Sequence, residues 1–272
     1  MQRKKSTVVP TRRVFFEEFL QSDFFIQEDG MTFLVTPTGA RCKRLLGIGE
    51  VQEVEIRGNI ARIKVDDSTA TLNIYTNKAI HVEGVKKTKA GEEKTFLAFL
   101  GNVRVRAGAG ARKRNILLAE EVGTVDERVR ADWVLNTAWR TMERIELIRS
   151  TISSNKKQEN VFSDKAILEA LEYYALDNDK LDALANTAIN AVKSLWQRYH
   201  TTTKEMILEI VKQAEKRGVE REKLVQALKN KGLDEAWVEE VTDELIVDGR
   251  CYASDSGVLI VLEDTIKKVS DI

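Results

Sequence analysis

The sequence has 272 residues, enough for two or three domains with separate hydrophobic cores. Its 43 basic and 43 acidic residues cancel, and it has no apolar run of the length that a bilayer requires, so we expect no membrane protein. The basic N-terminus MQRKKSTVVP lacks the apolar core of a signal peptide. Two isolated cysteines, Cys42 and Cys251, predict a reduced cytoplasmic protein without a disulfide scaffold, and their spacing to the two histidines matches no zinc motif.

The zero net charge conceals a division between the two halves of the chain. Residues 1–115 have 21 Lys and Arg against 13 Asp and Glu, a net charge of +8. Residues 116–272 have 22 bases against 30 acids, a net charge of −8. This asymmetry favours a front half that faces a polyanion and a back half that faces another kind of partner.

Residues 1–123 are predicted to form a mainly β domain preceded by an N-terminal arm. The runs GEVQEVEI, IARIKVDDSTATLNIYT, KTFLAFLGNVRV and NILLAEEV alternate apolar and polar residues or are continuously apolar. Turn residues separate them, and both Asp66 and Asp67 are interpreted as turn-stabilising side chains without a catalytic or metal-binding role. About five strands within about 80 residues predict a small closed barrel of the OB type.

The stretch RVRAGAGARKRN, residues 104–115, combines basic side chains with small residues. A Walker loop would need Gly-Lys-Ser/Thr before a helix, whereas Gly110 is followed by Ala-Arg-Lys. The dinucleotide fingerprint also fails, because no glycine stands three residues after Gly110. Apolar, β-prone runs flank the stretch on both sides, so we predict a basic hairpin that contacts a polyanion.

A barrel that binds single strands combines a basic groove with aromatic platforms, each stacked base contributing about 1–3 kcal/mol. Aromatic residues are scarce here: Tyr75 is placed to reach such a groove, and Phe96 and Phe99 lie on opposite faces of one strand. The residues expected to contact nucleic acid are Arg57, Arg62, Lys64, Tyr75, Lys78, Arg104, Arg106, Arg112, Lys113 and Arg114.

Residues 124–152 change to a helical period. Thr124 and Glu127 have the spacing of a capping box, and apolar residues follow at helical intervals through Ile152. This row is longer than one small barrel needs, which indicates a helix that meets other subunits. The side chains expected at that subunit interface are Leu135, Ala138, Met142 and Ile145.

Residues 153–162 are polar and are predicted to be a linker. Residues 163–199 follow as two helices, predicted to form a helical hairpin to which the sequence assigns no function. The motif Asp177-Asn178-Asp179 lacks the glycine and the terminal glutamate of a calcium loop, so no metal site is expected.

Residues 200–265 predict three helices and a β-hairpin, the arrangement of a winged helix. Thr202 and Glu205 are expected to cap the first helix, and Gly218 and Gly232 to end the first two. The charged residues of the third helix, from Asp234 to Asp248, are all acidic. The phosphate groups of DNA would repel such a helix in the major groove. We therefore predict a protein-docking module with Glu239, Asp243 and Tyr252 as docking residues.

The order of these elements resembles the middle subunit of replication protein A. The series GIGEVQEV, IARIKVDDSTATLNIYTNK, FLAFLGNVRV, NILLAEEV and a long helix follows that order, and the upstream RRVFFEEF and LVTPTGARCKRLLGIGEV are similar to the archaeal replication protein A-associated subunit. The resemblance covers residues 11–152 and 201–263. Where that family has stacking aromatics, this sequence has Lys78 and Arg106, which implies salt-sensitive, mainly electrostatic binding.

The resemblance implies a subunit of an archaeal single-stranded-DNA-binding complex. Its expected partners are single-stranded DNA, other replication protein A-like subunits, and replication or repair proteins that dock on the winged helix. No cofactor is expected, and no constellation of catalytic residues is recognisable, so we expect no enzyme. Two alternatives stay open: a structural adaptor without DNA contacts and a winged-helix transcription regulator. A telomere-capping-type subunit, also a barrel plus a winged helix, is a variant of the single-strand-binding and adaptor hypotheses.

Overall fold

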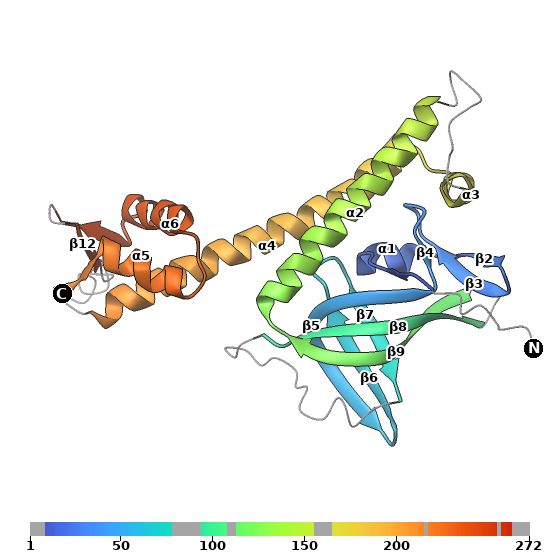
Figure 1. Ribbon diagram of the computed structural model, residues 1–272, viewed down its shortest axis with the longest axis horizontal. Helices are drawn as coiled ribbons and strands as arrows, with labels where there is room; N and C mark the ends of the chain where they lie inside the picture. Colours follow the sequence, from blue (N-terminus) through green and yellow to red (C-terminus); the bar gives the residue numbers. More distant parts are fainter. Residues whose placement is uncertain are drawn as a thin grey trace, which may run out of the picture. The chain divides into compact units, whose positions relative to one another are not determined.

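The computed structural model describes residues 9–77, 94–107, 113–154, 165–214, 217–254 and 257–262. The chain divides into two compact units, Met1–Ser194 and Leu195–Ile272. One helix, α4 (Asn178–Gln213), contains the boundary between the units (Figure 1). Across the described part of the chain, no helix is both long and apolar enough to cross a membrane.

The first unit contains a closed five-stranded barrel. Its strands are β5 (Arg44–Arg57), β6 (Ile60–Asp66), β7 (Thr71–Thr76), β8 (Phe96–Ala107) and β9 (Lys113–Val125). They are bonded in the order β5-β6-β7-β9-β8, and β8 pairs with β5 to close the ring. The β7–β9 pairing is parallel and the other pairings within the ring are antiparallel. This strand order is that of the OB fold, so the predicted barrel is confirmed.

The barrel core is filled by alternate residues of each strand, as the sequence pattern predicts. Ile63, Ile74, Leu97 and Leu117 are almost completely buried. Gly47 is required on β5, because a Cβ there would lie 2.3 Å from Cζ of Phe99 and 2.9 Å from Cε1 of Phe16. The absence of a side chain at this position lets two aromatic rings approach the strand.

A short helix, α1 (Phe16–Gln21), covers one end of the barrel and lies between it and α2 (Glu127–Ser154) (Figure 1). Phe16 and Phe19 are fully buried. The ring of Phe16 lies 5.8 Å from that of Phe99 on β8 and 6.1 Å from that of Trp133 on α2. The arm before the barrel thus contributes Phe16 and Phe19 to the core, while its exposed strand β1 (Thr11–Arg12) pairs with β5.

Asp67 attaches α1 to the β6–β7 turn. Its Oδ2 accepts the backbone N–H of Phe16 at 2.8 Å, while Oδ1 accepts the N–H groups of Thr69 at 2.8 Å and Ala70 at 3.1 Å. Asp66 accepts the N–H of Ser68 at 2.7 Å. The interpretation of both aspartates as turn-stabilising is confirmed, and Asp67 in addition holds the start of a helix 51 residues earlier in the chain.

The start of α2 differs from the predicted capping box. Thr124 belongs to strand β9, where it pairs with Leu97. The helix is capped by Asp126, whose Oδ1 accepts the N–H of Val129 at 2.8 Å. The pairing of β9 with β8 continues to Val125 and holds Thr124 in an extended conformation, so the cap moves to the next suitable residue.

The remaining helices of the first unit pack on α2 and on a small sheet. This sheet consists of β2 (Phe24–Glu28), β3 (Met31–Val35) and β4 (Arg41–Cys42). Tyr173, the last residue of α3 (Lys165–Tyr173), stacks on Phe24 with ring centroids 4.3 Å apart. The hydroxyl of Tyr174 donates to the carbonyl of Val35 at 2.8 Å. These contacts give the helices after residue 164 the structural role that the sequence left unassigned.

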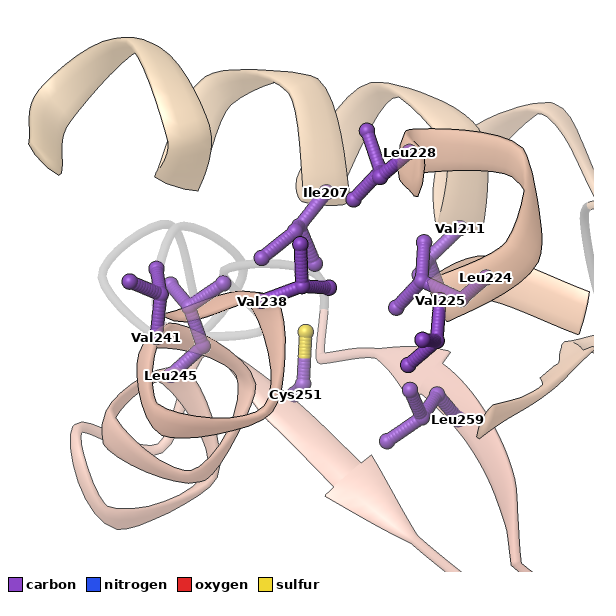
Figure 2. Close-up of a cluster of buried hydrophobic side chains, with 10 residues drawn as sticks. All are labelled: Ile207, Val211, Leu224, Val225, Leu228, Val238, Val241, Leu245, Cys251 and Leu259. Atoms are coloured by element: carbon purple, nitrogen blue, oxygen red, sulfur yellow. The ribbon is translucent and has the colours of Figure 1, made fainter. Parts of the chain in front are cut away.

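The second unit contains the end of α4, α5 (Arg221–Asn230), α6 (Glu235–Val247) and a three-stranded antiparallel sheet. The sheet is formed by β10 (Val219–Glu220), β12 (Val258–Val261) and β11 (Cys251–Ala253), in that order. Figure 2 shows Ile207 of α4, Val238 of α6 and Leu259 of β12 converging on one core. Cys251 lies in this core, and both it and Cys42 are buried free thiols.

The predicted helix break before residue 202 is wrong, because α4 continues from Asn178 to Gln213. The sequence QRYHTTTK contains no glycine or proline that would interrupt it. The Thr201 and Thr203 hydroxyls donate to the carbonyls of Gln197 and Tyr199, each at 2.9 Å. These two threonines thus bond back to the preceding turn, and Thr202, the predicted cap, lies between them inside the helix.

Candidate nucleic-acid interface

The outer face of the barrel brings together three predicted residues, Arg62, Lys64 and Tyr75. Ala61, Ile63 and Val65 point into the core, so the alternating Arg62 and Lys64 of β6 point outward. The register pairs Arg62 with Tyr75 of β7 and Tyr75 with Leu118 of β9. The Leu118 side chain is 43% exposed. A ring and an aliphatic side chain therefore adjoin two cations on one face.

Two glutamates on β5 share this face and were not anticipated. Arg62 Nη2 lies 2.8 Å from Oε1 of Glu55 and 3.4 Å from Oε2 of Glu53, and Arg57 lies 3.7 Å from Glu55. The tight β5–β6 turn forces this juxtaposition, because it pairs Glu55 with Arg62 and Glu53 with Lys64. The alternation EVEIR already indicates that Glu53 and Glu55 lie on one face of the strand. That they pair with Arg62 follows only from the strand register. Part of the predicted positive charge is thereby neutralised.

The predicted basic hairpin is formed by β8 and β9. Its register places Arg104 opposite Ile116, Arg106 opposite Arg114, and Ala107 opposite Lys113. Arg104 is exposed and follows Asn102, whose partner Leu118 lies on the same outer face. The hairpin is therefore continuous with the outer barrel face that contains Tyr75 and Leu118. Arg112 and Lys78 lie outside the described residues.

Two polar residues that the sequence analysis overlooked fix the position of this hairpin. Asn115 of β9 donates from Nδ2 to the carbonyls of Phe19, at 3.3 Å, and Ser22 at the end of α1. Glu120 accepts from both Arg44 and Asn102, which joins β5, β8 and β9 on the outer face. The base of the basic hairpin is thus attached to the barrel and to its covering helix.

The predicted subunit-interface row on α2 is mostly covered by the chain itself. Ile145 is fully buried in a cluster with Ile148, Ile167 and Leu181, against which Met142 also packs. Ala138 is 6% exposed. Leu135 alone of the row points outward, at 48% exposure, beside Trp139 at 59%. The row is covered because α3 and α4 pack against the apolar stripe of α2, which the sequence analysis assigned to other subunits.

The predicted docking residues of the second unit are all on its surface, in different environments. Glu239 is exposed on α6, and Tyr252 of β11 is 52% exposed. Asp243 pairs with Arg221 at 2.7 Å. Hydrogen bonding to Arg221 lowers the pKa of Asp243 and raises that of Arg221. Glu235 and Glu244 also pair with bases of α5 and α4, so much of the negative charge of α6 is compensated within the unit.

Within the part of the chain that is described, no three His, Cys, Asp or Glu residues are grouped so as to hold a metal ion. Burial raises the pKa of Cys42 to about 12, so this thiol stays protonated at neutral pH.

Comparisons with known proteins gave solved structures only: no family model and no curated protein matched the chain. A replication protein A heterotrimer bound to single-stranded DNA has a chain that matches at 13% identity and a TM-score of 0.36, covering 50% of this chain and 98% of its own. The Schizosaccharomyces pombe Stn1–Ten1 complex matches at 14% identity and a TM-score of 0.33, covering 53% of this chain and 96% of its own. At these scores the assignment of the barrel rests on its strand order and register.

Proposed function

We propose that this chain is a subunit of an archaeal replication protein A-like complex and binds single-stranded DNA with its barrel. The observation that carries the proposal is the outer barrel face, where Tyr75 and Leu118 adjoin Lys64 and lead into the basic β8–β9 hairpin. Such a face offers a stacking surface for bases and cations for the phosphate backbone. The function needs no cofactor, metal or catalytic group.

The expected binding is mainly electrostatic. Tyr75 is the one aromatic side chain among the outward residues of this face that the structure describes. Glu53 and Glu55 compete with phosphate for Arg62. The hairpin cations are therefore the principal contacts, and affinity should fall steeply as salt rises.

Replacing Arg104, Arg106, Arg112, Lys113 and Arg114 by serine is expected to weaken binding to an oligo(dT) strand by about 100-fold at low salt. Each lost phosphate contact should flatten the slope of log affinity against log salt by about 0.7. Fluorescence anisotropy across a salt series measures both quantities. A matched variant replaces five cations elsewhere, Arg128, Arg140, Arg198, Lys223 and Lys231, and should bind as the wild type does. An unchanged affinity and slope in the folded hairpin variant would reject the proposal.

A second candidate function is a structural adaptor that uses the barrel only as a scaffold. The observation that favours it is the pair Glu53 and Glu55, which places negative charge beside Arg62 on the outer face. An adaptor would not shift any oligonucleotide in a gel at low salt, even with its partner subunits present. Replacing both glutamates by glutamine should strengthen DNA binding if the barrel is a DNA-binding surface and have no effect if it is an adaptor.

We propose further that the second unit is a winged helix that recruits replication or repair proteins. Three helices followed by a hairpin, with a third strand at β10, support this assignment. Glu239 and Glu240 are exposed on α6 and would repel the phosphates of duplex DNA, which disfavours a transcription regulator. Specific duplex binding that depends on α6 would revive that alternative.

For assembly with other subunits we propose the outward face of α2, with Leu135 and Trp139 as central contacts. The guanidinium of Arg140 lies 4.7 Å from the Trp139 ring centroid, so the ring is held on the helix surface. Large exposed aromatic and aliphatic residues on a rigid helix are typical of interface hot spots.

Leu135→Glu combined with Trp139→Glu is expected to abolish association with barrel subunits while leaving the chain folded. Sedimentation velocity of the chain alone and mixed with candidate barrel subunits of the same genome measures this. Met142→Glu with Ile145→Glu serves as the contrasting variant: Ile145 is buried against α3 and α4, so that pair should unfold the helical packing. Unimpaired association of the first variant would remove this face from the assembly model.

A further inference from the structure

Three aromatic side chains form one patch on the second unit, here called the aromatic patch: Trp196 and Tyr199 of α4 and Trp237 of α6. The ring centroids of Trp196 and Trp237 are 4.6 Å apart, and Tyr199 stacks on Trp237 at 5.6 Å with an interplanar angle of 22°. Trp196 is 57% exposed and Tyr199 is 39% exposed. The three rings thus make a contiguous surface that water contacts.

The patch is rigid. Trp237 Nε1 donates to the buried Thr203 hydroxyl at 3.1 Å, and the ring of His200 meets the Trp237 ring edge-on at 5.6 Å. His200 Nε2 lies 2.6 Å from Oε2 of Glu244, one further connection between α4 and α6. A partner that binds here would lose little free energy in ordering the surface, because the rings are already held by two helices.

The exposed rings contribute little to the fold of the unit. Its core consists of aliphatic residues such as Ile207, Val238 and Leu245, which lie together in Figure 2, and Trp196 and Tyr199 are not among them. Exposed aromatic residues grouped on one surface are characteristic of protein interaction sites. Trp237 packs against this core, but the exposed Trp196 and Tyr199 require an explanation other than core packing.

The charges around the patch indicate the kind of partner. Glu240 is exposed one turn after Trp237 and has no ion-pair partner among the described side chains. Burial and, second, the negative charge of Asp234 raise the pKa of Tyr199. Lys204, a base of α4 that reaches α6, is already paired with Glu244 and Asp248. Residues 195–272 contain 12 bases against 16 acids, a net charge of −4. A cationic partner complements this surface.

We propose that the aromatic patch is a docking surface for an arginine-bearing amphipathic helix of a partner protein. Arginine side chains would stack on Trp196 and Tyr199, where a planar guanidinium is attracted by the ring face, and would pair with Glu240. Apolar residues of the same helix would cover the edge of Trp237. The proposal rests on the recruiting role proposed for the second unit, and it places that role on α4 and α6, away from Glu239, Asp243 and Tyr252.

The test uses the full chain and a synthetic amphipathic peptide with leucines on one face flanked by arginines. Binding is followed by the anisotropy of the labelled peptide at two salt concentrations. Trp196→Ala with Tyr199→Ala should weaken it at least about tenfold, Trp196→Phe should retain most of it, and Glu240→Lys should weaken it mainly at low salt. The matched control, Glu239→Lys with Tyr252→Ala, should bind within about twofold of the wild type. Thermal unfolding confirms that each variant is folded.

Several outcomes would overturn the proposal. Equal peptide binding by the Trp196→Ala, Tyr199→Ala variant would do so, as would no binding by the wild type. Loss of binding only in the Glu239→Lys, Tyr252→Ala variant would reject the patch but leave recruitment by the second unit intact. Because Lys193 lies one turn before Trp196, an oligo(dT) strand is run in parallel. If binding of oligo(dT), and not binding of the peptide, requires Trp196, the patch is a nucleic-acid surface and the proposal fails.

Discussion

Arg144→Met is expected to destabilise the chain by about 3–5 kcal/mol, because it removes the cation that pairs with the buried carboxylate of Glu18. Glu18 of α1 is 3% exposed, and its Oε2 lies 3.5 Å from Nη2 of Arg144 on α2. Thr38, in the turn before β4, donates its hydroxyl to Glu18 at 2.5 Å and accepts from Arg144 Nε at 2.7 Å. Without Arg144 the carboxylate keeps Thr38 but loses its counter-charge.

Urea unfolding followed by circular dichroism measures the loss. Two variants separate the buried charge from simple loss of packing. Adding Glu18→Gln to Arg144→Met should restore part of the stability, since no charge then remains buried. Arg140→Met on the same helix breaks an exposed pair with Glu143 and should cost less than about 1 kcal/mol. Similar losses for Arg140→Met and Arg144→Met would show that the Glu18 contact is not important for stability.

Asp67→Ala is expected to destabilise the first unit by about 3 kcal/mol, because it leaves the buried backbone N–H of Phe16 and the partly buried N–H groups of Thr69 and Ala70 without their acceptor. The loss should loosen α1 as well as the turn, which hydrogen exchange at residues 16–21 would detect. Asp66→Ala is the matched control in the same turn and should cost about 1 kcal/mol, since Asp66 is only partly buried. Unchanged exchange in α1 would contradict the proposed attachment.

The same residue predicts a pH dependence. Burial raises the pKa of Asp67, although hydrogen bonds from Thr69, Phe16 and Ala70 act in the opposite direction. The folded chain therefore holds this proton more tightly than the unfolded chain. The protonated carboxyl of Asp67 therefore stabilises the fold fully below the ordinary pKa of an aspartate. This stabilisation is lost as the pH rises through the raised pKa of Asp67 in the folded chain. Between wild type and Asp67→Ala, the stability difference should shrink as pH rises through that window.

Much of the barrel was predictable from the sequence, because its determinants are local. Apolar and polar residues alternate along β6 and β7, short turns join neighbouring strands, and the basic run 104–115 is flanked by strand-forming segments. The two-residue turn after Arg57 and the Asp66–Asp67 turn are recognisable from residue type alone. The hairpin that carries Arg104, Arg106, Lys113 and Arg114 follows from these signals.

The candidate site itself was predictable only in part. Arg62, Lys64 and Tyr75 were identified by residue type and position, but their neighbours Glu53, Glu55 and Leu118 follow from strand register. Register depends on pairing between strands and is not written in either strand alone. The aromatic patch was missed for a similar reason: Trp196 and Trp237 are far apart in the chain and meet only when α4 and α6 pack.

By itself the sequence determined the strand segments of the barrel, the basic hairpin and the amphipathic character of the helix after it. The tertiary structure decided what covers that helix: Ile145 packs inside the chain, and Leu135 and Trp139 face outward. It also decided that α4 is continuous and that Glu18 pairs with Arg144, 126 residues away. An apolar stripe or a charged residue specifies that a partner is needed, while the identity of the partner depends on how distant segments pack together.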